Sequence, residues 1–322
     1  MKVVDILERA PGPPLSYEII PPVRGGSFDQ VMALVEALMP YRPAFIDVTS
    51  HAAEAVYDER PDGTLRRVVK RKRPGTLGLC AAIRYRFGVE TVPHLLCKGF
   101  TREETEDALI ELHYLGIRNV MALQGDDHGV AKIERPDRTR NGHAIDLVEQ
   151  IAAMNRGRYL EVLDDAAATD FCVGVAGYPE RHYEAPNPHW DVAHLARKVA
   201  AGADYVVTQM FFDNARYFDF VSRCRAAGVT VPIVPGLKIA TSKAHLSSLP
   251  RAFHVELPEP LAGELASASS ERAVDIGVDW AVNQVRGLVA GGAPGIHFYI
   301  LQSSRVITRV VEALRTEGLA GG

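Results

Sequence analysis

The 322-residue sequence lacks the cysteine pattern that marks several protein classes. It has only four cysteines, and no two of them form a Cys-x-x-Cys pair. The spacing therefore indicates neither a disulfide framework nor a zinc site, and we expect no metal centre. Reduced, mostly buried thiols are usual in a cytoplasmic protein, and this is what we expect of Cys80, Cys97, Cys172 and Cys224.

Long apolar runs and strong charge are also missing. No run approaches the length of a membrane span, and residues 1–10 contain acidic side chains instead of the apolar segment of a signal peptide. The net charge of −4 is mild, which argues against nucleic acid as the main partner. The one basic cluster, residues 66–73, is interpreted as the solvated end of a helix and not as a binding patch.

What the sequence does contain is a regular alternation of short apolar runs and amphipathic segments. A hydrophobic content of 47% is enough for a substantial core. The apolar runs predict strands at 15–20, 44–48, 92–97, 117–126, 172–176, 205–211, 232–237 and 296–301. Helical spacing predicts helices at 27–39, 74–87, 101–115, 141–154, 190–201, 217–227 and 303–316.

Eight strands that alternate with helices are typical of a single α/β barrel of the (β/α)8, or TIM, type, which we predict for residues 1–322. A doubly wound open sheet is the main structural alternative. No Gly-x-Gly-x-x-Gly follows the first strand, so a Rossmann dinucleotide site is unsupported. Residues 155–170 are interpreted as a surface insertion, and we expect no regulatory domain after the last helix.

Polar side chains follow the C-terminal ends of several predicted strands. The run at 117–126 stops at Gly125 and Asp126, and in α/β folds this end of a strand lies at the rim where ligands bind. Gly-Asp pairs are also common in ordinary turns, so the pair alone does not decide. In a barrel, one mouth would collect Glu18, Thr49, Gln124, Asp126, Tyr178, Gln209, Lys238 and Tyr299. This convergence predicts an enzyme.

Glu18 lies near the end of the first apolar run. A carboxylate is costly to bury without a partner, and burial raises the pKa of a carboxyl group, which suits a proton donor. From the residues alone, an ion pair with an arginine is an equally good explanation.

Nearly the whole sequence resembles 5,10-methylenetetrahydrofolate reductases of the bacterial type. The resemblance includes Tyr-Glu-Ile-Ile-Pro-Pro at 17–22, Ala-Leu-Gln-Gly-Asp at 122–126 and Thr-Gln-Met-Phe-Phe-Asp at 208–213. Other matching pieces are 45–49, 93–95, 116–121, 175–182, 198–203, 233–236 and 295–299. Each piece alone is a weak signal, whereas their order and spacing together identify the family.

The resemblance implies an oxidoreductase of one-carbon metabolism that serves methionine biosynthesis. In this family a barrel holds FAD, which takes hydride from NADH or NADPH and passes it to methylenetetrahydrofolate in a ping-pong cycle. Glu18 matches the general acid, and Gln209 matches the residue that contacts both folate and nicotinamide. Asp126 matches a carboxylate near the flavin and the pterin, where its charge should lower the flavin potential and stabilise an iminium.

The same residue-by-residue match implies further contacts. Thr49 is expected near the nicotinamide, and substrate positions fall on Ile239, Tyr299 and Ser303. Arg197 and Lys198 carry the paired positive charge expected to face the FAD pyrophosphate. Without the resemblance, an equally good interpretation is that they are solvated charges on a helix. The FAD positions fall on Ser50, Ala52, His94, Gln124, Gly125, Asp126, Ala144, Tyr178, His182, Ala185, Asp191, His194, Arg197 and Lys198.

Two other hypotheses stay open beside the flavin-dependent reductase. Gln124, His143 and His194 stand where the family commonly has arginine, tyrosine and asparagine. These differences motivate a family member that works without flavin by direct hydride transfer from NADH. The third hypothesis is a non-catalytic barrel that binds folate or a nucleotide. The resemblance also implies a homo-oligomer.

Overall fold

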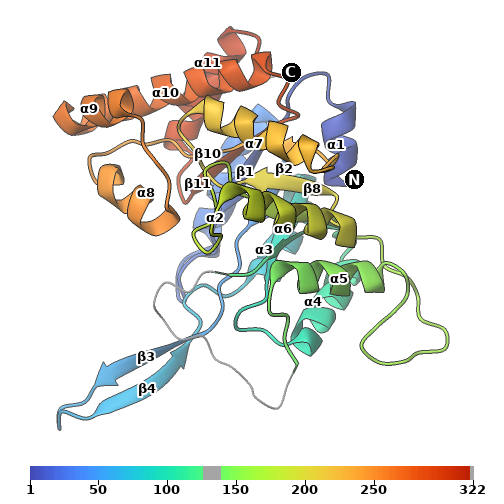
Figure 1. Cartoon of the computed structure of the whole chain (residues 1–322). Coiled ribbons are helices and arrows are strands. Elements are labelled where there is room, and N and C mark those ends of the chain that lie inside the picture. Colours follow the sequence, from blue (N-terminus) through green and yellow to red (C-terminus); the bar gives the residue numbers. More distant parts are fainter. Residues whose placement is uncertain (126–138, 320–322) are drawn as a thin grey trace.

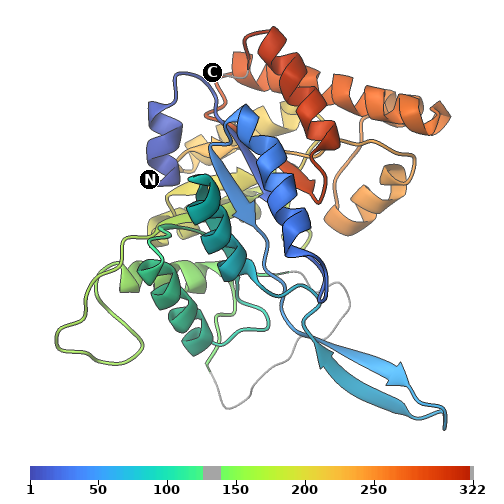
Figure 2. The ribbon, with the colours of Figure 1, turned by 180° about the vertical axis from the view of Figure 1, so that it is seen from behind.

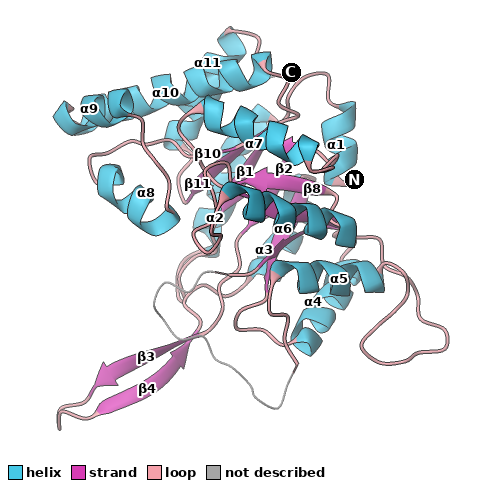
Figure 3. Ribbon diagram, in the orientation of Figure 1, coloured by secondary structure: helices cyan, strands magenta, loops and turns pink. Residues whose placement is uncertain are grey.

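A ring of parallel strands surrounded by helices forms the computed structural model, which describes residues 1–125 and 139–319 (Figures 1 and 3). The predicted (β/α)8 barrel is confirmed. Its ring contains β1 (Leu15–Ile19), β2 (Phe45–Val48), β5 (Glu90–Leu96), β6 (Asn119–Leu123), β7 (Cys172–Gly177), β8 (Tyr205–Thr208), β9 (Ile233–Val234), β10 (Gly236–Leu237) and β11 (Ile296–Leu301). Asp126, predicted to lie at the rim after β6, falls outside the described residues.

The ring closes around Pro235. On one side of this residue β9 pairs with β8, and on the other side β10 pairs with β11. Proline has no N–H to give to a ladder, so it divides the predicted seventh strand into two short pieces. Its carbonyl accepts a hydrogen bond of 2.9 Å from the N–H of His297 on β11. The seventh strand therefore contacts both of its neighbours despite the interruption.

All seven predicted helices form, each with ends close to the prediction. They are α2 (Phe28–Leu38), α3 (Thr76–Phe87), α4 (Arg102–Tyr114), α5 (Ala144–Met154), α6 (Pro188–Ala201), α7 (Asn214–Ala226) and α11 (Arg305–Thr316). The capping box predicted at the start of α4 is present, because Thr101 accepts from the N–H of Glu104 and Glu104 accepts in return. Helices α5 to α7 cover one side of the ring in Figure 1, and Figure 2 shows α2 to α4 on the other.

Four helices were not predicted. The short α1 (Val3–Arg9) precedes the barrel, and three more fill the connection between β10 and β11: α8 (His245–Phe253), α9 (Glu259–Ser267) and α10 (Ser270–Ala290). A single 3-10 turn, η1 (Met39–Tyr41), extends α2. Helix α10 packs beside α11 at one side of the molecule (Figure 1).

The core of the barrel has an outer and an inner layer, and a third apolar cluster lies among α8, α9 and α10. Outward-facing strand residues such as Val120 and Val206 pack against the surrounding helices. A separate apolar cluster fills the inside of the ring with Phe45, Met121 and Tyr205. The interior is thus packed and is not a channel, as expected for a barrel of this size.

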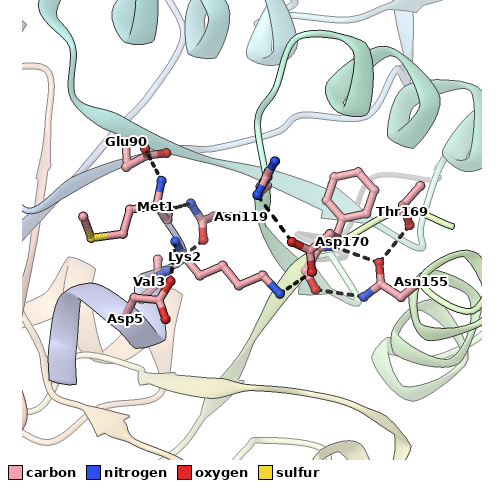
Figure 4. Close-up of polar contacts among 11 residues, drawn as sticks. Met1, Lys2, Val3, Asp5, Glu90, Asn119, Asn155, Thr169 and Asp170 are labelled. Atoms are coloured by element: carbon pink, nitrogen blue, oxygen red, sulfur yellow. Dashed lines mark hydrogen bonds and ion pairs between the residues drawn. The ribbon is translucent and has the colours of Figure 1, made fainter. Parts of the chain in front are cut away.

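Helix α1 closes the amino end of the ring. Val3 belongs to the interior cluster, and its N–H donates to Oδ1 of Asn119 at 2.8 Å. The Nδ2 of Asn119 donates to the carbonyl of Met1 at 3.0 Å, which holds the segment in place (Figure 4). Because this end is sealed by packed side chains, the carboxyl ends of the strands are left for ligands.

The expectation of a helix end at residues 66–73 is wrong. Half of the six basic residues, Arg66, Arg67 and Lys70, lie on β4 (Leu65–Lys70). This strand pairs with β3 (Glu54–Glu59) in an antiparallel hairpin that projects from the barrel (Figure 1). The missed signal is Pro-Asp-Gly at 61–63, a turn sequence in which Gly63 has φ of 79° and Asp62 accepts from the N–H of Thr64. Over the described ranges, no helix combines the length and apolar character that crossing a membrane requires.

We predict that the closure of the ring does not tolerate a side chain at Gly236. A Cβ there would lie 2.2 Å from the carbonyl oxygen of Thr208 and 2.7 Å from the ring of Tyr299. Gly236→Ala should therefore lower the free energy of unfolding by about 1–3 kcal/mol, measured by urea denaturation.

Gly263→Ala is the matched control for this prediction. Gly263 lies within α9, and an added Cβ would meet no atom within 4 Å. This variant should be unchanged or more stable by up to about 1 kcal/mol, since alanine favours helix over glycine. Equal stability of the two variants would contradict the packing argument.

Candidate active site

Of the polar residues predicted to converge, those that the structure describes lie at one mouth of the barrel. Glu18 is on β1 and Tyr299 on β11, and the two are register partners. Because every pair of strands in the ring is parallel, the residues that end the strands face the same side. The remaining members follow β2, β6, β7, β8 and β10, and are Thr49, Gln124, Gly125, Tyr178, Gln209 and Lys238.

Glu18 lies beside a buried imidazole. Its Oε2 is 3.7 Å from Nε2 of His94, and the Glu18 side chain is 13% exposed. The same nitrogen is 3.3 Å from Oδ1 of Asp47, whose side chain is fully buried. His94 is thus one ion-pair partner of Glu18.

The charges around His94 determine its protonation. Burial lowers its pKa, but the hydrogen bond to Asp47 and the charges of Glu18 and Asp47 outweigh this effect. The net result is a pKa raised above 6.5. An imidazolium is therefore favoured beside the two carboxyl groups.

Tyr299 connects several parts of the mouth. Its hydroxyl donates to the carbonyl of Thr208 at 2.5 Å, and its own carbonyl accepts from Nζ of Lys238 at 2.9 Å. Burial lowers the pKa of Lys238, while the charge of Glu18 acts in the opposite direction. These contacts hold the ammonium group of Lys238 at the mouth, where the charge of Glu18 acts on it.

Gln209 follows Thr208 directly and is fixed by its main chain. Its N–H donates to the carbonyl of Gly177 at 2.7 Å, which joins the ends of β7 and β8. Its side-chain Oε1 accepts from the N–H of Met210 at 2.9 Å. The side-chain oxygen of Gln209 is therefore held by the adjacent main chain.

A second cluster lies after β6 and β7. The rings of Tyr178 and His182 meet edge to face with centroids 4.5 Å apart, and the N–H of His182 donates to Asp191 at 2.9 Å. Gln124 donates to Glu184 at 3.4 Å. Four of the predicted cofactor positions are thus neighbours here, with a fifth, Ala185, in the same loop.

Lys198 has the chemistry of an anion-binding residue. Its Nζ donates to the carbonyl of Ala176 at 2.8 Å, and burial lowers its pKa to about 8 although Asp191 opposes the shift. A half-buried ammonium group with one neutral acceptor is stabilised by an anionic ligand, so this residue fits a pyrophosphate. Arg197 and His194 are exposed on the same helix, α6.

Other predicted positions lie farther apart. Ser50 and His94 line a cavity of about 170 Å³ together with Arg71, Arg73 and Phe100. Ala52 is buried near this region, Ala144 begins α5, and Ser303 is exposed before α11. The described structure therefore does not gather every predicted contact into one pocket.

Sequence reasoning missed Asp47 and His297. Both are buried inside the ring, and His297 lies with Nδ1 2.9 Å from the hydroxyl of Ser16. The available signal was a charged residue within the apolar run Phe-Ile-Asp-Val at 45–48, which a buried strand accepts only with a partner.

Comparisons with known proteins agree on one family. Residues 3–315 match the family model described as methylenetetrahydrofolate reductase. Methylenetetrahydrofolate reductase 1 of Schizosaccharomyces pombe is 30% identical over 304 residues, which cover 93% of this chain and 45% of that protein. The 5,10-methylenetetrahydrofolate reductase of Salmonella typhimurium is 29% identical over 303 residues, which cover 93% of this chain and 90% of that protein. The chain spans about half the length of the fungal and plant relatives it matches.

A solved structure supports the fold alone. An uncharacterized protein from Clostridium thermocellum, described as binding two copies of 5-methyl-5,6,7,8-tetrahydrofolic acid, has a TM-score of 0.57. The alignment covers 97% of each chain at 13% identity.

We predict that His297 makes the protein less stable in acid. Burial lowers its pKa to about 4, with a further decrease from His94 and an opposing effect of Asp47. The contribution of neutral His297 to stability is present above the ordinary histidine pKa near 6.5 and is lost as pH falls toward 4. In this interval the imidazole takes up a proton in the unfolded chain but not in the folded one. Between pH 7.5 and 5 the wild type should lose up to about 2 kcal/mol more stability than His297→Asn.

Urea denaturation of both proteins at the two pH values measures this difference. Other titrating groups are shared by the wild type and the variant, so they cancel in the comparison. Parallel losses of stability would show that the neutral buried imidazole is not responsible.

Proposed function

Since the chain belongs to the methylenetetrahydrofolate reductase family, we propose that it reduces 5,10-methylenetetrahydrofolate to 5-methyltetrahydrofolate with NADH or NADPH. The observation that carries this proposal is the position of Glu18, a nearly buried carboxyl group at the carboxyl mouth of the barrel. Relatives with this family name include plant proteins described as NADH enzymes, which supports NADH as one donor.

Glu18 is proposed as the general acid. Opening the five-membered ring of the folate requires a proton on the departing nitrogen, and a carboxyl group held out of water can supply it. Gln209 follows Thr208, whose carbonyl accepts from the hydroxyl of Tyr299 at the mouth where the substrate would enter. Ile239 follows Lys238 at the same mouth. Ser303 and Asp126 complete the proposed substrate contacts, and the structural description does not include Asp126.

FAD is the proposed cofactor. When bound, it supplies a hydride carrier for a ping-pong exchange between nicotinamide and folate. Lys198 would face its pyrophosphate, since its half-buried ammonium group has a pKa lowered to about 8 and one carbonyl acceptor. Tyr178, His182 and Asp191 form the neighbouring wall. The other residues proposed to contact it are Thr49, Ser50, Ala52, His94, Gln124, Gly125, Ala144, Ala185, His194 and Arg197.

One observation favours a flavin-free alternative. Gln124 stands where the family commonly has arginine, and here it donates to the carboxylate of Glu184 at 3.4 Å. This contact leaves a negative charge beside a proposed cofactor position. A purified protein that is yellow, with a flavin band bleached by NADH under anaerobic conditions, would exclude the alternative.

We propose that the barrel is the catalytic unit and that it works in the cytoplasm. The support for the second point is that Cys80, Cys97, Cys172 and Cys224 are all free and buried. Thiols of this kind persist in a reducing compartment. A homo-oligomeric state is also proposed, on the resemblance alone.

We predict that Glu18→Gln separates the two half-reactions. The amide cannot deliver a proton, so methylenetetrahydrofolate reduction should fall by roughly 10²–10⁴-fold. Reduction of the quinone menadione by NADH needs no such proton donor and should keep the wild-type rate. The two activities are measured on the same preparation.

Glu36→Gln is the control for Glu18→Gln. It makes the same chemical change in an exposed side chain on α2, outside the barrel mouth. This variant should keep both activities, and full folate reduction by Glu18→Gln would remove Glu18 as the acid.

We also predict that Lys198→Met weakens flavin binding. Methionine keeps the length of the side chain and removes its charge, so a contact to a phosphate is lost while the packing is kept. Loss of a charged hydrogen bond corresponds to a Kd higher by roughly 10- to 100-fold, measured by flavin fluorescence during titration of the apoprotein. Lys70→Met, on the exposed hairpin, should bind as the wild type does; equal binding by both variants would contradict the assignment.

A further inference from the structure

Two acidic side chains share one ring nitrogen inside the barrel. Nε2 of His94 lies 3.3 Å from Oδ1 of Asp47 and 3.7 Å from Oε2 of Glu18. The three residues come from adjacent strands β1, β2 and β5, and Glu18 and Asp47 are register partners. The arrangement is therefore fixed by the sheet and does not depend on a loop.

Asp47 depends on His94 for its charge balance. Its side chain is fully buried, and His94 is its one ion-pair partner within the described ranges. Its other oxygen, Oδ2, has no hydrogen-bond partner there. A buried carboxylate with so few contacts is stable only beside a positive charge, so Asp47 favours the imidazolium form of His94.

Glu18 has a different relation to the same imidazole. It is the more exposed of the two carboxyl groups and lies farther from Nε2. The closer Asp47 stabilises the imidazolium by itself while Glu18 holds its proton, so a second proton lies on the adjacent ring.

We propose that Asp47 is a positioning residue that keeps His94 protonated, and that His94 returns a proton to Glu18 in each turnover. The proposal rests on the proposed function of Glu18 as general acid. Glu18 gives its carboxyl proton to the departing folate nitrogen and becomes a carboxylate. The imidazolium then passes its Nε2 proton to Glu18 and becomes neutral, and solvent reprotonates it when the product leaves.

Other titratable groups near the cluster are less suited to this role. The hydroxyl of Tyr299 is already donated to Thr208, and Lys238 donates to a main-chain carbonyl. His297 is neutral because burial lowers its pKa to about 4. Burial also raises the pKa of Tyr205. On the cavity side, the charged or titratable residues are His51, Arg71, Arg73 and Glu104.

The test is the pH dependence of Asp47→Asn. Asparagine keeps the shape and can still accept from Nε2, but it removes the charge that favours the imidazolium. Histidine NMR titration should show the His94 pKa above 6.5 in the wild type and at least one unit lower in the variant. The alkaline limb of kcat for folate reduction should move to lower pH by the same amount, with KM unchanged.

Three further readouts separate this role from a structural one. Folate reduction by Asp47→Asn should fall at least tenfold at pH 8 and recover toward the wild-type rate as pH is lowered. Reduction of menadione by NADH should not change. Asp204→Asn is the control, because Asp204 is a half-buried carboxylate whose Oδ2 accepts from the N–H of Val173 near the opposite end of the barrel. The pH profile of this variant should match that of the wild type.

The outcomes distinguish the possible failures. A wild-type His94 pKa below 6.5, or one that Asp47→Asn does not move, would overturn the Asp47–His94 pair even if the variant were unstable. A lowered His94 pKa with an unmoved alkaline limb would overturn the proton return. If the wild type reduces no folate at any pH, the proposed function fails, while the NMR titration still decides the pair.

Discussion

The closure of the strand ring at Pro235 is the constraint on which the site depends. The short strands β9 and β10 lie on either side of Pro235, and they pair with β8 and β11 respectively. The sheet therefore closes into a ring although proline has no N–H to donate. Closure fixes the register of every strand, and it thereby sets Glu18 opposite Tyr299 on one side and Asp47 on the other. Residues about 280 positions apart in sequence become neighbours through this ring, not through direct contacts between loops.

Much of the fold could be predicted because the strands and helices have strong local signals. The capping box at Thr101 and the apolar run before Gln124 are examples, and both elements form as predicted. The hairpin was missed because Val68 and Val69 are the only apolar pair among the arginine and lysine residues of the second strand. The run was therefore interpreted as a charged helix end, and the turn at Asp62 was not used to predict two paired strands. The helices α8, α9 and α10 between β10 and β11 were not predicted, because they are additions to the strand–helix repeat and do not alternate with strands.

The candidate site was predictable in location but not in its partnerships. Parallel strands alone require that Glu18 and Gln209 approach the same mouth. No periodicity, however, specifies that the neighbour of Glu18 is His94, because that contact depends on the rotation of two side chains inside the ring. The role of Asp47 was not predicted for a related reason. A single aspartate in an apolar run can be assigned a role only when its partner on another strand is known.

The interior of the barrel changes from apolar to polar along its axis. Phe45 is followed by Asp47 two residues later on the same strand face, and Val92 is followed in the same way by His94. The apolar layer lies nearer the end sealed by α1, where burial stabilises the ring without a need for partners. That layer can offset the cost of burying charged groups above it, so the mouth can hold a carboxyl group and an imidazole away from water. A site of this kind combines low solvent access with fixed geometry, and those two conditions are what controlled proton transfer requires.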